Sequence, residues 1–283
     1  MHKHQTKTPH DRWQRYTDKI RRYAASKAQG GCDDWEVHTL KGSPDIATPK
    51  ELRPPEAAHL LELRKHQNKE GYGDQPHQDG FLPDDHDPLI TTHLLTKQGT
   101  LSKEPVGTVS LKVSRSAEGD LEFVMHLASG SAKKSLKKGY LPPQFQVLLD
   151  KTLQLRDQQP DARVVAMSGY FVKKEFRGSR GDIAGPMLFD AVLDVFQSDS
   201  TGLLLLTVDD NELWELYSRI GLCKVQANKT KKAGWSHPMY GHIQDLRSKR
   251  SLMLKPVPGG GCGAGNASST RTGGGQCWVQ PGW

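Results

Sequence analysis

Hydrophobic residues in the second half of the chain alternate between strand-like and helix-like patterns. The run GLLLLTV is apolar almost throughout, as expected of a strand that is buried on both faces. The helical stretches place their apolar side chains on one face. The expected elements are a strand at 163–172, a helix at 186–196, a strand at 202–208, a helix at 210–220, a strand at 222–225 and a candidate closing strand at 252–254. This order predicts a parallel pair of strands joined by a right-handed crossover.

The first half of the chain predicts further strands in an antiparallel arrangement. Short apolar runs are separated by polar turns, which indicates a meander. A helix is expected after Thr48-Pro49 or, equally, after a restart at Pro54-Pro55, because proline suits the first helical position. The expected elements are a strand at 35–40, that helix to about residue 68, strands at 89–95, 106–113 and 121–127, and a helix at 145–155. The two halves together predict an α/β fold with a mixed sheet.

The two ends of the chain differ from the part between them. Residues 1–30 are basic and rich in histidine, and four of them recur at helical spacing: Trp13, Tyr16, Ile20 and Tyr23. We expect a helix there that packs on the body of the protein rather than anchoring it to a membrane or to RNA. Residues 256–283 are dominated by glycine without a periodic apolar pattern, which predicts a flexible tail. Residues 31–255 then form the main domain.

Composition narrows the class of protein further. The formal net charge is +7, with 25% charged and 35% hydrophobic residues. This modest excess favours an anionic partner, such as a phosphorylated cofactor, but does not favour specific nucleic-acid binding. Four cysteines in 283 residues form neither a disulfide framework nor a metal knuckle, which is typical of a reduced, cytoplasmic protein. No apolar stretch is long enough to span a membrane, and the first residues lack the apolar core of a secretion signal.

The loop of the predicted crossover carries candidate chemistry. Residues 175–188 read EFRGSRGDIAGPML, with three glycines and two arginines directly before an apolar helix. Glycines let the backbone approach a ligand closely, and a helix N-terminus attracts phosphate. The arginines Arg177 and Arg180 add full positive charges. The segment therefore predicts either a pyrophosphate cradle or an ordinary glycine-rich turn with two solvated arginines, and it matches neither the GxxxxGK[ST] nor the GxGxxG pattern.

The segment VDDNELWELYSRIGL at 208–222 decides how the loop is interpreted. Together the two stretches resemble the core motifs of the GNAT acyltransferase superfamily. The first motif is matched by Val172, Phe176, Arg177 and Gly178, although Arg180 interrupts its usual glycine spacing. The second motif is matched by Asn211, Leu216, Tyr217, Gly221 and Leu222, with Trp214 in place of the usual alanine. The resemblance covers residues 165–225 well and the upstream strands loosely, and it implies that residues 31–255 form a GNAT-like acyltransferase domain.

The resemblance implies a fold, a co-substrate and a set of site residues. The sheet would be mostly antiparallel and flanked by helices, with one parallel, splayed pair of strands forming an acyl-CoA cleft. An amine would attack the thioester of acetyl-CoA or another acyl-CoA directly, without a metal. Main-chain groups of Phe171 and Val172 would hold the pantetheine, and Asn211 would orient the cofactor or cap its helix. Tyr217 would protonate the leaving thiolate. The pyrophosphate would lie on the amides of Gly178, Ser179, Arg180, Gly181, Asp182, Ile183 and Ala184.

The general base is less well defined by the sequence. Glu122 is the first candidate, beside His126 and His93, because all three lie on predicted strands whose alternation could aim them into the cleft. The acidic turn at Asp84–Asp87 is interpreted as solvated rather than as a metal site.

Other functions stay open at this level. The upstream half, with Leu63-Arg64, the acidic turn and Val106-Gly107-Thr108, resembles acyl-homoserine lactone synthases and N-acyl amino acid synthases. The donor could therefore be an acyl-carrier protein. A third hypothesis is a non-catalytic module that holds CoA or RNA, which the interrupted first motif permits. The acceptor is expected to be the amine of a small molecule or of a protein.

Overall fold

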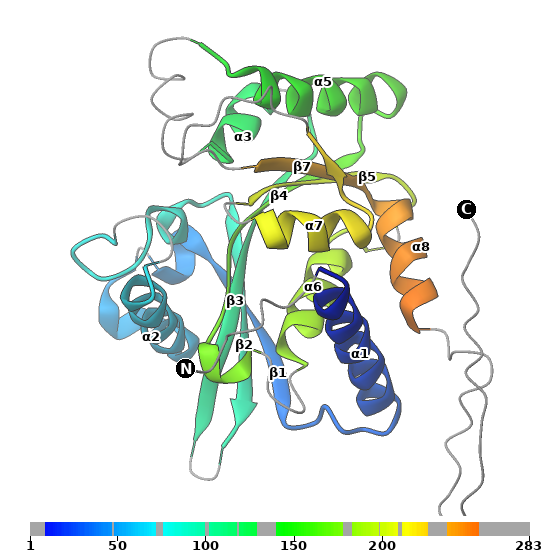
Figure 1. Cartoon of the computed structure of the whole chain (residues 1–283). Coiled ribbons are helices and arrows are strands. Elements are labelled where there is room, and N and C mark those ends of the chain that lie inside the picture. Colours follow the sequence, from blue (N-terminus) through cyan, green and yellow to red (C-terminus); the bar gives the residue numbers. More distant parts are fainter. Residues whose placement is uncertain are drawn as a thin grey trace, which may run out of the picture.

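A seven-stranded mixed sheet forms the centre of the computed structural model, with strand order β1-β2-β3-β4-β5-β7-β6 (Figure 1). The structure describes residues 9–46, 48–71, 76–99, 102–117, 119–128, 140–177, 183–197, 199–208, 211–225 and 237–254. The strands are β1 (Trp35–Lys41), β2 (Ile90–Gln98), β3 (Lys103–Ser114), β4 (Arg163–Val172), β5 (Gly202–Val208), β6 (Cys223–Lys224) and β7 (His237–His242). Neighbouring strands are antiparallel except for the parallel pair of β4 and β5. The predicted α/β class and mixed sheet are thus confirmed.

Helices cover both faces of the sheet (Figure 1). They are α1 (Pro9–Ala28), α2 (Pro55–Lys69), α3 (Asp120–His126), α5 (Pro143–Gln158), α6 (Ala184–Asp194), α7 (Asn211–Arg219) and α8 (Ile243–Leu254). Four short helical turns lie at Gly42–Ile46, Lys50–Leu52, Pro83–His86 and Lys174–Phe176. The core on one face joins α1, α6, α7 and α8, whereas the other face carries one cluster under α2 and another under α3 and α5. Within the described ranges, no helix is long and apolar enough to cross a membrane.

Strand β5 shows why the sheet is buried on both faces. Leu203 and Leu205 pack into the cluster under α3 and α5, and Leu204 and Leu206 pack into the cluster under α6. Successive side chains of a strand point to opposite faces, so a strand between two helical layers needs apolar residues at every position. The prediction of a buried strand at 202–208 is confirmed.

Two predicted strands are wrong, and both segments are helical. Residues 121–127 lie in α3 and its C-terminal cap, after Gly119, whose φ of +85° starts the helix. Phe123, Val124 and Leu127 are buried together against α5, a spacing that suits one helical face. Residues 252–254 are the last turn of α8 rather than a closing strand.

The strand that the sequence did not predict is β7. It pairs with β5 on one side and with β6 on the other, both antiparallel. Its sequence, HPMYGH, contains a proline, a glycine and two histidines, so it lacks the apolar alternation that marks a strand. Helix α2 begins at Pro55, which confirms the restart of the helix at the second proline pair.

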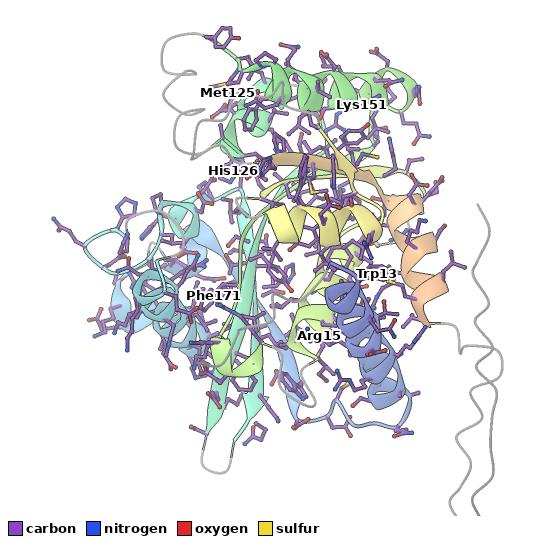
Figure 2. All side chains as sticks on the ribbon, in the orientation of Figure 1. Trp13, Arg15, Met125, His126, Lys151 and Phe171 are labelled. Atoms are coloured by element: carbon purple, nitrogen blue, oxygen red, sulfur yellow. The ribbon has the colours of Figure 1, made fainter. Side chains whose placement is uncertain are left out.

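Helix α1 packs on the body of the protein, as expected. Ile20 and Tyr23 are buried in the same cluster as α6 and α8. Trp13 lies where α1 meets α7 (Figure 2), with the guanidinium of Arg219 5.7 Å from its ring. Helices α6 and α8 are joined beneath α1 by an ion pair of 2.8 Å between Arg250 and Asp190.

Candidate functional site

The parallel strands β4 and β5 part before β4 ends. Their ladder runs from Arg163 opposite Gly202 to Met167 opposite Leu206. Strand β4 continues five residues farther, to Val172, and β5 pairs with β7 as far as Val208. Ligands of open α/β sheets bind in crevices at the carboxyl ends of parallel strands. The point where this pair separates is therefore the candidate site.

A β-bulge lies on β4 at the same point. Thr108 of β3 is opposite Phe171, but Ser110 is opposite Ser168, so two residues of β4 face one residue of β3. Gly169 lies in the bulge with a φ of +58°, a left-handed conformation that glycine adopts without strain.

The bulge reverses which residues face which helices. Met167, before the bulge, packs in the cluster under α6, and so do Tyr170 and Val172 after it. Phe171 instead packs in the cluster under α2 (Figure 2). In an unbulged strand of the same residues, strict alternation would send Phe171 to the face of Met167. The bulge thus decides the shape of the site.

The described part of the predicted cradle is the start of α6. Ile183 and Ala184 are buried, and the helix begins at Ala184 without a side-chain cap and without an acidic residue in its first turn. The hydroxyl of Tyr170 donates to the carbonyl of Gly185 at 3.2 Å, which joins the bulge to the start of the helix. A helix N-terminus of this kind suits a phosphate. Residues 178–182, the rest of the predicted cradle, lie outside the described residues.

Arg177 lies toward α2. Its guanidinium is 2.9 Å from a carboxylate oxygen of Glu70 and 4.9 Å from the ring centre of Phe171. Its Nε donates to the carbonyl of Val172. The side chains of Phe171 and Val172 are buried. The resemblance assigns main-chain groups of these two residues to pantetheine, so the burial of their side chains is compatible with that role. A phosphate that recruits Arg177 would compete with Glu70.

Tyr217 and Asn211 both belong to α7. Asn211 is its first residue, and its side chain lies outside what the structure describes. Tyr217 is buried in the core beneath α1. Burial, reinforced by nearby Tyr16, raises the pKa of Tyr217 far above its ordinary value. Trp214 stacks on the ring of His237 at 4.6 Å, and its buried Nε1 has no hydrogen-bond partner among the described residues.

The three candidate bases are not brought together. Glu122 lies on an exposed part of α3, so the strand alternation that favoured it does not exist. His93 is on β2, next in sequence to Thr92 and Leu94, which face α2, so His93 points to the opposite face. Nδ1 of His93 is 3.3 Å from the hydroxyl of Thr39, whereas His126, at the end of α3, meets the carboxylate of Asp84.

His93 gives a pH-dependent prediction of stability. Burial lowers its pKa, and its buried Nε2 has no hydrogen-bond partner in the described part of the chain. As pH falls below about 6.5, the unfolded chain binds a proton that the folded protein does not, so the free energy of unfolding decreases until the lowered pKa is reached. We expect His93→Gln to flatten this part of the pH profile, measured by urea unfolding from pH 5 to 8. If the free energies of unfolding of wild-type and His93→Gln protein differ by the same amount at every pH from 5 to 8, the assignment is contradicted.

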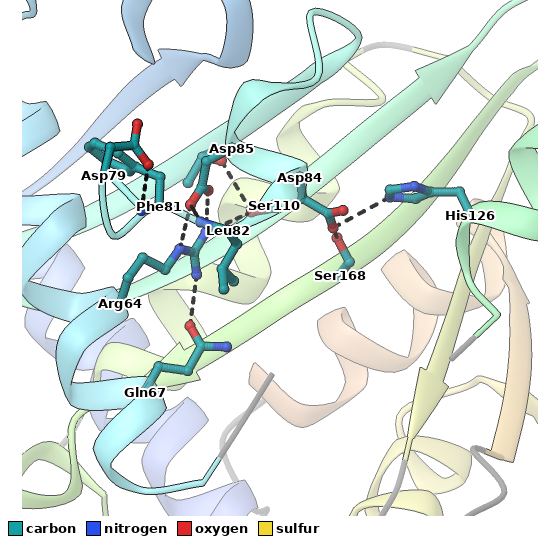
Figure 3. A network of polar contacts seen from close by, with 11 residues as sticks. Arg64, Gln67, Asp79, Phe81, Leu82, Asp84, Asp85, Ser110, His126 and Ser168 are labelled. Carbon is teal, nitrogen blue, oxygen red and sulfur yellow. Dashed lines mark hydrogen bonds and ion pairs between the residues drawn. The ribbon is translucent and has the colours of Figure 1, made fainter. Parts of the chain in front are cut away.

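Polar residues from three separate elements meet beside the bulge (Figure 3). The hydroxyl of Ser168 on β4 donates to Oδ2 of Asp84 at 3.0 Å. Nε2 of His126 is 3.6 Å from the same oxygen. The sequence predicts His126 as one of three candidate bases and Asp84 as part of a solvated acidic turn. Nothing in the sequence indicates that these two residues and Ser168 lie together.

A buried ion pair holds the turn that carries Asp84. Arg64 of α2 donates from Nε and Nη2 to the two oxygens of Asp85, at 2.9 and 2.6 Å (Figure 3). Both side chains are fully buried. The remaining donors of Arg64 reach Gln67 and Ser110, and Asp85 also accepts from the amide of Leu82. The charges are thus paired and hydrogen-bonded, as buried charges must be.

Comparisons with known proteins give structural matches at low identity. No family description matches the chain, and no curated protein matches it. The fold is similar to FeeM, an N-acyl amino acid synthase from uncultured soil microbes, with 14% identity, a TM-score of 0.45 and coverage of 77% of this chain and 96% of that one. It is also similar to Arabidopsis thaliana NAA60 in complex with acetyl-CoA, with 12% identity, a TM-score of 0.40 and coverage of 73% and 97%.

A third match is an acetyltransferase from Streptococcus agalactiae 2603, with 11% identity, a TM-score of 0.39 and coverage of 74% and 98%. These matches each cover about three quarters of this chain.

Proposed function

We propose that the protein is an acyl-CoA-dependent N-acyltransferase, with acetyl-CoA as the first donor to test. The observation that carries the proposal is the early separation of β4 and β5 at Met167 and Leu206, with a bulge on β4 directly after it. This arrangement separates two parallel strands at the edge where ligands of such sheets bind. The start of α6 lies beside the bulge through the bond between Tyr170 and Gly185.

The described residues fit the co-substrate. Main-chain groups of Phe171 and Val172 lie beyond the end of the parallel ladder, where they can meet the amides of pantetheine. The uncapped start of α6, at Ile183 and Ala184, suits the pyrophosphate. The loop 178–182 and Arg177 complete the proposed cradle. Acyl-CoA supplies an activated thioester, so the protein has to orient it, remove protons from the attacking amine and protonate the leaving thiolate.

The chemistry proposed is direct transfer. The amine nitrogen attacks the thioester carbon, the new carbon–nitrogen bond forms, the carbon–sulfur bond breaks, and the thiolate receives a proton. We propose Tyr217 as the donor of that proton. Tyrosine, with an ordinary pKa of about 10, is protonated at physiological pH, and burial raises the pKa of Tyr217 further, so the proton is present when the thiolate forms. The same burial makes Tyr217 a weak acid, so its contribution is expected at the low end of the usual range for acid catalysis.

Calorimetric titration with acetyl-CoA and with longer acyl-CoAs tests the donor site. We expect wild-type protein to bind with micromolar affinity, and Arg177→Ala with Arg180→Ala to weaken binding by about 10²-fold, because each arginine contributes charge-assisted hydrogen bonds to phosphate. The matched control removes two exposed arginines away from the site, Arg22 and Arg115, and should bind as wild type does.

Each other outcome has a defined meaning. Failure of the wild-type protein to bind any acyl-CoA contradicts the proposed donor and leaves an acyl-carrier protein to be tested. Binding that the double substitution does not weaken contradicts the cradle. Binding without transfer to any amine supports the non-catalytic alternative. The acyl chain length that binds best indicates which acyl group is transferred.

A further inference from the structure

We propose that Asp84, Ser168 and His126 form the acceptor site, in which Asp84 binds the ammonium group of an alkylamine and His126 accepts its proton. This inference rests on the proposed acyl transfer and adds the acceptor class and the base. The sequence predicts Glu122 as the first candidate for the base, but within the described residues no hydrogen bond or ion pair joins Glu122 to this group.

The three residues lie where the parallel strands separate. Ser168 follows Met167, the last residue of β4 that pairs with β5. Helix α3 is tied to the same point on β5, because the hydroxyl of Thr207 donates to the carbonyl of Leu127 at 3.3 Å. His126 precedes Leu127 and therefore also lies beside the end of the ladder. The group thus adjoins the place where the thioester is proposed to lie, on the face opposite α6.

The carboxylate of Asp84 differs from its neighbours in the same turn. Asp85 is paired with Arg64, and Asp87 is paired with Lys112 at 3.0 Å. The partners of Asp84 within the described residues are the hydroxyl of Ser168 and the imidazole of His126, and neither is a permanent cation. Its side chain is 32% exposed, so it is accessible to a ligand. A carboxylate with these partners can accept a further hydrogen bond from an ammonium group.

The residues can carry the proton transfers that amine acylation needs. An alkylammonium ion has three N–H protons, and the amide product keeps one. The first proton goes from the ammonium group to His126 and then to solvent, which leaves a neutral amine to attack. The second leaves the nitrogen as the carbon–sulfur bond breaks, and through solvent it replaces the proton that Tyr217 gives to the CoA thiolate. Histidine suits the first step because its ordinary pKa, about 6.5, lies near neutral pH.

The charge of the site also selects among amines. The carboxylate of Asp84, which has no permanent cation beside it among the described residues, favours a positive group and disfavours a second negative group nearby. An α-amino acid carries its carboxylate next to the amine and would bring it close to Asp84. An alkylamine without a neighbouring carboxylate avoids this repulsion. We therefore expect 1,4-diaminobutane or a lysine side chain, rather than a free amino acid, to be the acceptor.

Steady-state kinetics with acetyl-CoA and three acceptors test this assignment: 1,4-diaminobutane, a peptide with one lysine and a blocked N-terminus, and glycine. Asp84→Asn should raise the KM for the amine at least about tenfold, because it removes a charge-assisted hydrogen bond. His126→Gln should lower kcat by about 10²-fold. Ser168→Ala should change the amine KM in the same direction as Asp84→Asn, to a smaller extent. Binding of acetyl-CoA, measured by calorimetry, should be unchanged in all three.

The pH profile separates a base from a residue that only supports the structure. In wild-type protein, kcat should fall at acid pH as His126 becomes protonated, and this limb should be absent in His126→Gln. Among the groups that face His126 are Asp84 and Asp87, the latter paired with Lys112. Burial raises the pKa of Asp87, but the Leu89 amide and Lys112 outweigh it and hold that pKa below the ordinary range. Asp87 therefore stays charged over the neutral range and does not account for the limb.

The controls are His242→Gln and Asp161→Asn, two exposed positions outside the site, which should leave both constants unchanged. The assignment is overturned if wild-type protein acylates an amine while Asp84→Asn and His126→Gln keep its kinetic constants and pH profile. A loss confined to Glu122→Gln, or a preference for glycine, overturns it as well. Failure of the wild-type protein to bind or use acyl-CoA is a different result, because it removes the proposed function on which the acceptor site depends.

Discussion

Asp85→Asn is expected to destabilise the fold by about 3–5 kcal/mol, the usual cost of breaking a buried ion pair from one side. Arg64 and Asp85 have no exposed side-chain surface, and two hydrogen bonds join them. The asparagine would leave the guanidinium charge buried beside a neutral amide. Because Asp85 also accepts from the Leu82 amide, the turn that carries Asp84 should loosen at the same time.

Urea unfolding measures this effect, and the chain offers a matched control. Lys97 and Asp34 form an exposed ion pair, and Asp34→Asn should cost less than about 1 kcal/mol. The double substitution Arg64→Met with Asp85→Leu should recover much of the loss, because it removes both buried charges. If Asp85→Asn costs no more than Asp34→Asn, the pair does not hold this part of the fold.

Deletion of Gly169 is expected to weaken acyl-CoA binding. The deletion removes the extra residue of the bulge, so β4 would pair with β3 as a regular ladder and would lose the bend and added twist that a bulge gives a strand. Phe171 and Val172 would keep their present faces, because Tyr170 would follow Ser168 in regular alternation. The straightened end of β4 would instead move relative to the start of α6, which would strain the bond between Tyr170 and Gly185.

Gly169→Ala is the matched variant, because it keeps the bulge. At a φ of +58° an alanine costs about 1–2 kcal/mol, and its Cβ would lie 3.1 Å from the hydroxyl of Ser110. We expect this protein to be less stable but to bind acetyl-CoA within a few fold of wild type. Calorimetry and thermal unfolding of both variants distinguish the two effects. Wild-type affinity in the deletion protein would contradict the role of the bulge.

The elements that the sequence predicted correctly are those with the strongest apolar patterns. Strands β4 and β5, the helices between and after them, and the restart of α2 at Pro55 follow from local rules of burial and capping. The segment of α3 is predicted as a strand because a pattern of seven residues is too short to distinguish strand from helix periodicity. The helix is stabilised by packing against α5, whose residues lie farther along the sequence. Strand β7 was missed because its position between β5 and β6 overrides a poor local propensity.

Less of the candidate site than of the fold could be predicted from the sequence. A bulge depends on the register between β3 and β4, which local pattern does not encode. Asp84, His126 and Ser168 come from three separate segments, so only the tertiary structure brings them together. The burial of Arg64 and Asp85 was equally hidden, because charged residues are rarely fully buried unless they are paired.

Amine-dependent release of CoA is the measurement that tests the central claim most directly. Purified protein is incubated with acetyl-CoA, with and without 1,4-diaminobutane or the lysine peptide, and free thiol is followed while the amine is weighed by mass spectrometry. We predict thiol release that requires the amine, together with a product heavier by one acetyl group. Acetyl-CoA that binds but releases no thiol with any amine, and leaves every amine unchanged in mass, would contradict the assignment of the protein as an N-acyltransferase.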